Sequence, residues 1–125
     1  MRRSTRHYLV AVAAVFGAMW LRRRWPVVRV EVVGDSMLPA LASGDRLLVL
    51  AGRAGVGDIV AVTDPRTPAR TLVKRVAARG PHGVTVLGDN PEASTDSRAL
   101  GPVAPAAIRG RAVYRYFPES RRGRL

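Results

Sequence analysis

The chain has 125 residues, enough for one small domain and too few for a nucleotide-binding domain joined to a substrate domain. It has no cysteine, which excludes disulfides, thiolate nucleophiles and cysteine-ligated zinc, and its two histidines, His7 and His82, lie near no partner for a triad or a metal site. Twenty arginines and one lysine against nine acids give a net charge of +12. That charge suits nucleic acid or an anionic membrane, but it fits an arginine-rich codon usage equally well. Within such usage the single lysine, Lys74, is conspicuous.

Residues 1–26 form a basic segment with a hydrophobic helix. An uncharged apolar run from Tyr8 to Leu21 lies between groups of arginines, and as a helix it would measure about 21 Å, against about 30 Å for a hydrocarbon core. Flanking arginines can snorkel, and Trp20 and Trp25 suit the interface, so we expect a membrane anchor. A signal peptide and a buried or interfacial helix are the alternatives. Arginines on both sides leave the orientation open.

Residues 27–118 are predicted to form a small, mainly β domain. Apolar and charged residues alternate over 28–33, which is typical of a half-buried strand. Residues 88–105 are expected to be a polar loop, and residues 119–125 a basic tail. No amphipathic helix is predicted after residue 26. Further strands are predicted at 46–50, 58–63, 71–79, 84–87 and 108–116, with a hairpin turn at 80–83.

Lys74 is the first candidate for chemistry. On the predicted strand it shares a face with Leu72, Val76 and Ala78, so it would be the one charge on an apolar side. Loss of hydration lowers the pKa of such a lysine, and a neutral amine can act as a general base. Arginine cannot replace it, because arginine does not deprotonate in proteins. The alternative is a lysine whose stem packs while its amine reaches water.

Ser36 and the segment 88–98 are the other candidates. Ser36 follows the first strand in a loop between Gly34 and Pro39, where backbone N–H groups are free to stabilise an oxyanion. The segment 88–98 is rich in short polar side chains that bond to the backbone, and it contains Asp96 and Arg98, which could pair. Taken singly, these features also fit an ordinary turn and a solvated loop.

Four motifs occur in the order found in the signal peptidase I family. Residues 34–41, Gly-Asp-Ser-Met-Leu-Pro-Ala-Leu, resemble its Ser-x-Met-x-Pro-x-Leu motif, and residues 57–60 resemble its Gly-Asp-Ile/Val motif. Residues 73–76, Val-Lys-Arg-Val, resemble the motif with the family's catalytic lysine, and residues 88–98 resemble its last motif. The resemblance implies a serine endopeptidase with the β fold shared by signal peptidases and LexA-type autoproteases.

This resemblance also implies roles for individual residues. Ser36 would be the nucleophile, with its own N–H in the oxyanion hole, and Lys74 the general base. Ser94 matches the serine that orients the lysine amine. Gly34 stands where some members carry a serine, which leaves the second oxyanion donor open. The other supporting positions are Met37, which anchors the nucleophile loop, Asp89 as a structural acid, and Asp96 with Arg98 as an ion pair.

Size and motif details look most like the small actinobacterial type described as nickel-type superoxide dismutase maturation protease. This resemblance implies that the partner is a dismutase precursor whose propeptide is removed, in the cytoplasm, with no metal or cofactor in this chain. A general signal peptidase acting on exported preproteins is the alternative. A non-catalytic basic β module for nucleic acid or anionic lipid is another, but the cluster Tyr114, Tyr116 and Phe117 is too small for a stacking platform, so no nucleic acid is expected. A LexA-like self-cleaving switch is a fourth.

Overall fold

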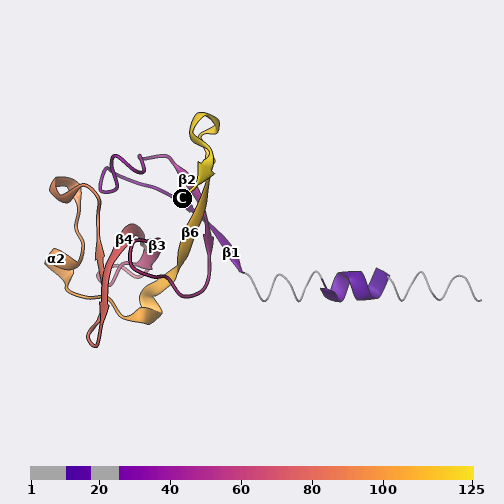
Figure 1. Ribbon diagram of the computed structural model, residues 1–125, viewed down its shortest axis with the longest axis horizontal. Helices are drawn as coiled ribbons and strands as arrows, with labels where there is room; N and C mark the ends of the chain where they lie inside the picture. The colour runs from indigo at the N-terminus through magenta and orange to yellow at the C-terminus, as the bar shows by residue number, and fades with distance from the viewer. Residues whose placement is uncertain (1–10, 18–25) are drawn as a thin grey trace, which may run out of the picture.

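In the computed structural model, residues 11–17 and 26–125 are described, and the second range contains a single antiparallel sheet (Figure 1). The sheet has the strand order β1-β2-β6-β3-β4-β5, and β7 pairs with β6. The prediction of a mainly β fold is therefore confirmed, and the six long strands begin and end within about two residues of their predicted limits. The six are β1 (Val27–Glu31), β2 (Arg46–Leu50), β3 (Ile59–Thr63), β4 (Thr71–Gly80), β5 (Gly83–Leu87) and β6 (Ile108–Phe117), and the seventh strand is the short β7 (Gly123–Arg124).

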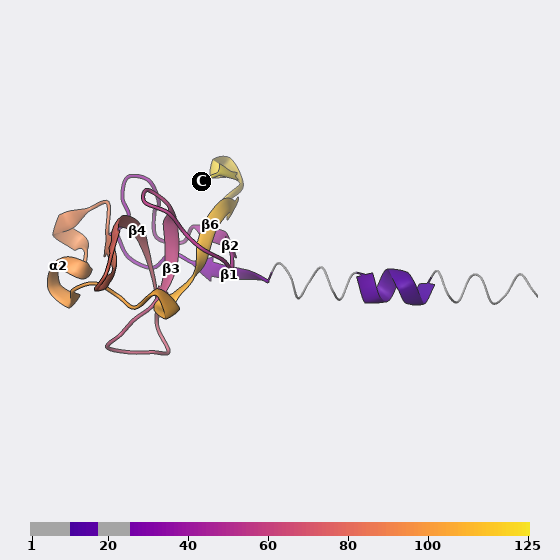
Figure 2. The ribbon, with the colours of Figure 1, turned by 60° about the horizontal axis from the view of Figure 1, so that its bottom comes forward.

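Short helical turns interrupt the segment that was expected to be a plain loop. They are η1 (Pro91–Ala93), α2 (Ser97–Leu100) and η2 (Pro105–Ala107), each too short to leave a helical period in the sequence. Asp96 begins α2 as its N-cap, accepting a hydrogen bond from the Arg98 N–H. Figures 1 and 2 both show α2 on the β4–β5 side of the domain, away from the C-terminal strand.

Half of the predicted anchor over residues 8–21 lies outside the described residues. Residues 11–17 are helical, and the ends of the apolar run belong to the parts of the chain that the structure does not describe. Within 11–17 and 26–125, the structure contains no helix with the length and hydropathy needed to cross a lipid bilayer.

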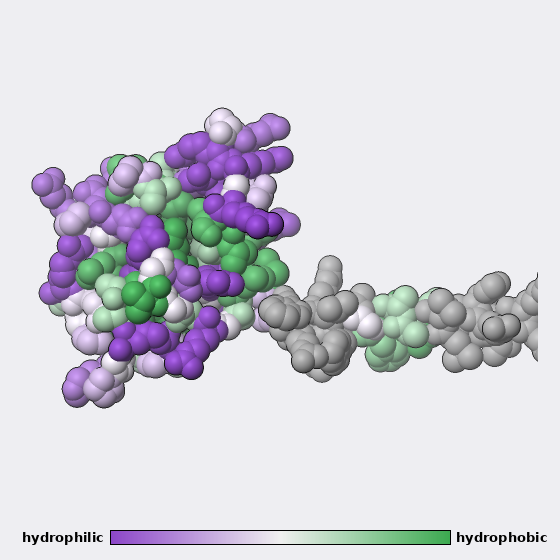
Figure 3. Space-filling view, viewed as in Figure 1, coloured by the Kyte–Doolittle hydropathy of each residue, from purple (hydrophilic) through white to green (hydrophobic). Residues whose placement is uncertain are grey.

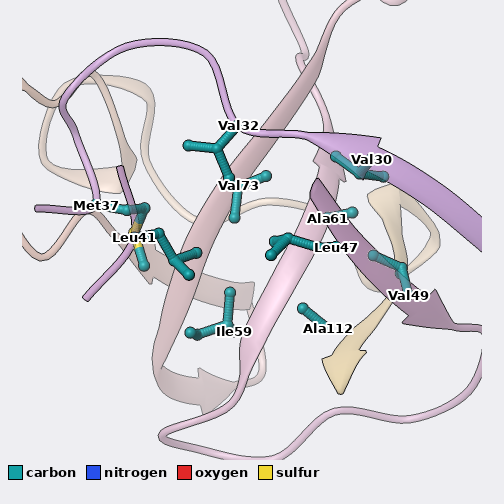
Figure 4. Close-up of a cluster of buried hydrophobic side chains, with 10 residues drawn as sticks. All are labelled: Val30, Val32, Met37, Leu41, Leu47, Val49, Ile59, Ala61, Val73 and Ala112. Carbon is teal, nitrogen blue, oxygen red and sulfur yellow. The ribbon is translucent and has the colours of Figure 1, made fainter. Parts of the chain in front are cut away.

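Strand β3 separates two hydrophobic clusters and is buried on both faces. Ile59 and Ala61 point into one cluster, and Val60 and Val62 point into the other. This explains its unbroken apolar sequence, which a half-exposed strand would not have. Figure 4 shows the first cluster, where side chains from the strands meet three residues of the segment between β1 and β2. Its members are Val30, Val32, Met37, Leu41, Leu47, Val49, Ile59, Ala61, Val73 and Ala112.

The C-terminal residues 119–125, expected to be a basic tail, fold back onto the domain. The turn η3 (Glu119–Arg121) leads into β7, which pairs with β6. Arg121 and Arg115 both reach the carboxylate of Asp45, which is fully buried. Arg115 also donates to the carbonyl of Ala40, at 3.2 Å. These contacts tie the C-terminal segment to the loop after β1.

Gly110 in β6 allows the close approach of β2. A Cβ atom there would lie 2.8 Å from the Leu50 carbonyl carbon and 2.9 Å from Val49 Cγ1. We expect Gly110→Ala to lower the free energy of unfolding by about 1–3 kcal/mol through overpacking, measured by urea denaturation. Gly80→Ala is the matched control, since nothing lies within 4 Å of its added Cβ. Equal midpoints for the two variants would contradict this account of the contact.

Candidate active site

Ser36 and Lys74 line one pocket, although 38 positions separate them in the sequence. The pocket has a volume of about 200 Å³ and opens between the chain that leaves β1 and the beginning of β4. Its walls are residues 31–36 on one side and residues 70–74 on the other, and Ala93 and Thr95 from the segment after β5 also line it. The sheet therefore brings together three of the four motifs found in the sequence.

The loop that carries Ser36 is held by buried apolar side chains and by a hydrogen bond from the backbone of Gly34. Met37 and Leu41 are completely buried in the first hydrophobic cluster, which anchors the loop as expected for Met37. Gly34 takes a positive φ of 88°, a conformation that favours glycine, and its N–H donates to Ser43 Oγ at 3.1 Å. Within the described part of the chain, the Ser36 N–H makes no hydrogen bond, so it is available to a bound group.

Lys74 is buried, and its environment disfavours the ammonium form. Only 4% of its surface is exposed. Burial lowers the pKa of Lys74; the charge of Asp96 opposes this, and Arg70 and Arg98 reinforce it. Its Nζ donates to Ser94 Oγ at 3.1 Å.

The apolar face predicted around Lys74 is present only in part. Leu72 is half-buried and Val76 is buried, as expected. Ala78 is exposed, because the pairing of β4 with β5 shifts register between Val76 and Ala78.

The carboxylate of Asp96 accepts hydrogen bonds from three residues. It accepts from Ser94 Oγ at 2.7 Å, from the Gly88 N–H at 2.8 Å and from the side chain of Arg98, so the expected ion pair with Arg98 is present. Burial alone would raise the pKa of Asp96, but these hydrogen bonds outweigh it and hold that pKa well below its usual range. Lys74, Ser94 and Asp96 thus form a chain of hydrogen bonds that ends on a carboxylate whose ionised form is favoured.

Comparison with known proteins identifies the family to which the chain belongs. Residues 5–86 and 81–117 match the family described as signal peptidase, peptidase S26. The chain belongs to the signal peptidase family. It is 35% identical to the mitochondrial ATP-independent inner membrane protease subunit 1a of Arabidopsis thaliana, over 82% of this chain and 77% of that protein. It is 34% identical to the mitochondrial inner membrane protease subunit 2 of Danio rerio, over 79% and 68%. It is a serine-type peptidase.

In this peptidase Asp89 links two further motifs. Its carboxylate accepts two hydrogen bonds from the guanidinium of Arg75, at 2.9 and 2.8 Å, and Arg75 also donates to the Gly57 carbonyl at 2.8 Å. Arg75 therefore holds the motif at 57–60 against the motif at 88–98. The sequence indicated a structural acid at Asp89 but not that Arg75 is its partner. Arg75 was noted only as part of the motif that contains Lys74.

Two residues that sequence reasoning gave no role hold Ser36 in place. The Asn90 N–H donates to the Ser36 carbonyl at 2.8 Å, and its side-chain amide donates to the Asp35 carbonyl at 3.1 Å. Gly88 lies where the Ser36 loop and Ser94 come closest, since an added Cβ would be 2.6 Å from the Ser36 carbonyl oxygen. The only signal for either residue was its place in the Gly-Asp-Asn motif.

Asp96→Asn is expected to destabilise the peptidase by about 2 kcal/mol at neutral pH, because an amide replaces a buried charge that accepts several hydrogen bonds. The folded-state pKa of Asp96 is depressed, so its stabilising effect is full above the unfolded pKa and is lost as pH falls toward the folded value. Urea denaturation between about pH 7 and pH 3 should therefore show the gap between wild type and variant narrowing. A constant gap would contradict this prediction.

Proposed function

We propose that Ser36 and Lys74 form the catalytic dyad of this peptidase. The observation that carries the proposal is a buried lysine, with a pKa lowered by desolvation, in the same pocket as a loop serine. Neutral Lys74 takes the Ser36 proton as the hydroxyl attacks the scissile carbonyl, and then donates it to the leaving amine. Lys74 next activates water, which hydrolyses the acyl-enzyme. Ser94 orients the amine, and Asp96 orients Ser94.

The oxyanion that forms during attack needs N–H donors. The Ser36 N–H is one candidate, because no other group in the described residues uses it. A donor of this kind contributes about 2.7–4 kcal/mol to transition-state stabilisation. Gly34 offers no side chain for a second donor, so a backbone N–H or the substrate itself would have to supply it.

The substrate binds as an extended strand in the gap between β1 and β4. Strand β5 pairs with β4 only from Arg75 onward, so residues 71–74 keep one edge open. On the other wall, the Val32 N–H donates to the Asp45 carbonyl and the Val32 carbonyl accepts from the Gly44 N–H, each at 2.8 Å. Because backbone groups alternate sides along an extended chain, those of Val33 face the pocket. A peptide between the two edges would gain main-chain hydrogen bonds from both.

For the substrate itself we propose the precursor of a nickel-type superoxide dismutase, whose propeptide is removed. The sequence resemblance of residues 33–39 and 88–98 supports this choice. A general signal peptidase that cleaves exported preproteins is supported about equally by the family.

Residues 27–118 would be the catalytic domain, with residues 1–26 as the membrane anchor. The named relatives are inner membrane proteases, which favours membrane association.

Co-expression with the dismutase precursor tests the function. The intact mass of the dismutase is read beside wild type, Ser36→Ala, Lys74→Ala and a matched control, Ser120→Ala, at an exposed serine. Wild type and Ser120→Ala should trim the precursor to an N-terminal histidine, and the other two should not. An intact precursor beside folded wild type would refute the dismutase assignment, and a secretory preprotein is then the substrate to test. Trimming by Ser36→Ala would refute the dyad.

A further inference from the structure

A second hollow continues from the active-site pocket along the outside of β1. It shares Glu31, Val33, Arg70 and Thr71 with the first pocket. It adds Arg29 and Val30 from β1, and Arg109 from β6. Val33 is 76% exposed at the junction, where it lines both hollows. A substrate strand that runs away from Ser36 along β1 would pass over this hollow.

The hollow carries an excess of positive charge. Three arginines, Arg29, Arg70 and Arg109, line it together with one acid, Glu31. None of the three lies within ion-pair distance of a carboxylate in the described ranges. The Arg109 guanidinium donates to Thr71 Oγ1 at 2.8 Å, which holds it beside the open edge of β4.

These arginines differ from their neighbours around the site. Arg66 is engaged with the buried carboxylate of Asp64, at 3.0 Å, and Arg75 and Arg98 are engaged with Asp89 and Asp96. Those three guanidinium groups are paired with buried or half-buried acids. In the described ranges, Arg29, Arg70 and Arg109 form no ion pair, although Arg29 lies over the ring of Tyr116, 5.9 Å from its centroid. Guanidinium groups bind carboxylates with two parallel hydrogen bonds.

We propose that this hollow is a subsite for an acidic side chain of the peptide substrate. The inference rests on the proposed dyad, because its position is counted from the scissile bond. Arg70 precedes Lys74 by four residues, which corresponds to about 13 Å along an extended strand. A substrate strand in the gap therefore places an Asp or Glu side chain at the arginines when that residue lies about four positions from the cleaved bond.

The test begins with a peptide library made from digested proteome. Cleavage sites produced by the full-length peptidase are identified by mass spectrometry, and Asp and Glu are counted at each position on both sides of the cut. The best substrate is then synthesised with its acidic residue and with the corresponding Asn or Gln. We expect acidic residues to be enriched about four positions from the cut on one side only, and the acidic peptide to have about five-fold higher kcat/KM than its amide partner.

Variants of the arginines locate the effect. Arg70→Gln with Arg109→Gln should bring the acidic-to-amide ratio of kcat/KM close to one, and Arg53→Gln, at an exposed arginine outside both hollows, should leave the ratio at its wild-type value. The ratio is the proper readout, since Arg70 also lowers the pKa of Lys74 and its loss affects every peptide. Raising the ionic strength from about 0.05 to about 0.5 M should reduce the ratio in wild type.

Three outcomes would overturn the subsite. One is cleavage without any acidic preference, which leaves the dyad intact. Another is an acidic preference that the double variant retains. The third is an unchanged ratio together with weaker binding of the double variant to phosphatidylglycerol vesicles, which would make the patch a lipid contact. The Ser36→Ala variant separates the two proposals: if it still cleaves the acidic peptide in preference to its amide partner, the subsite stands and the dyad is refuted.

Discussion

The Lys74→Arg variant is expected to cleave peptides about 10³-fold more slowly than wild type, because a guanidinium cannot give up a proton and act as the base. Arginine keeps much of the length of the side chain but brings a permanent charge into a buried site, so circular dichroism must show that the variant is folded before its rate is compared. We expect single-turnover rates to fall while the affinity of the variant for substrate changes little. Retained activity above a tenth of wild type would contradict the proposed role of Lys74.

The pH profile gives an independent check on the same residue. Only neutral Lys74 can accept the Ser36 proton, so kcat/KM should rise with pH as the ammonium form disappears. Since burial lowers the pKa of Lys74, the rise should be complete at a lower pH than an exposed lysine requires. Asp96→Asn removes the charge that raises this pKa, and it should shift the rise to still lower pH. A profile that Asp96→Asn leaves unmoved would argue against a charge effect on Lys74.

Gly88→Ala is the second change with a large expected effect. The added Cβ would meet the Ser36 carbonyl oxygen at 2.6 Å and the Ser94 side chain at a similar or shorter distance, so the nucleophile loop and the lysine-orienting serine must separate. A displacement of about 1 Å in a catalytic group can cost about 100-fold in rate, and we expect a loss of that order in kcat with a smaller change in KM.

Gly80→Ala is the control for the change at Gly88, because it introduces the same methyl group at the end of β4 with open space around it. Circular dichroism and a thermal melt show whether Gly88→Ala is still folded. A folded Gly88→Ala variant with the kcat of Gly80→Ala would show that the close approach at Gly88 does not position Ser36.

Local patterns were enough to predict most of the sheet. Alternating or continuous apolar residues marked the six long strands, because each buries at least one face against a hydrophobic cluster. The burial of Lys74 was predictable for the same reason, since its neighbours on the strand are apolar. Strand β7 was not predictable: Gly123 and Arg124 carry no alternation, and they pair with β6 through backbone groups alone.

The supporting contacts of the site were harder to predict because they join polar residues far apart in the chain. Arg75 with Asp89 and Asn90 with Ser36 depend on how the strands curve, and polar side chains leave no periodic signal in the sequence. The same holds for Asp45, which meets Arg115 and Arg121 about 70 residues later. Asp96 with Arg98 was predictable because a single residue, Ser97, lies between the partners.

The open edges of β1 and β4 make the conformation of a target as important as its sequence. In the binding mode that we propose, a peptide offers its own N–H and C=O groups to both edges at once, and a segment already folded into a helix or a sheet has none to offer. On the face drawn in Figure 3, hydrophilic side chains surround a hydrophobic area, so the face is not uniformly polar. We therefore expect cutting to be confined to leaders, tails and unfolded linkers, and we expect folded proteins to be spared.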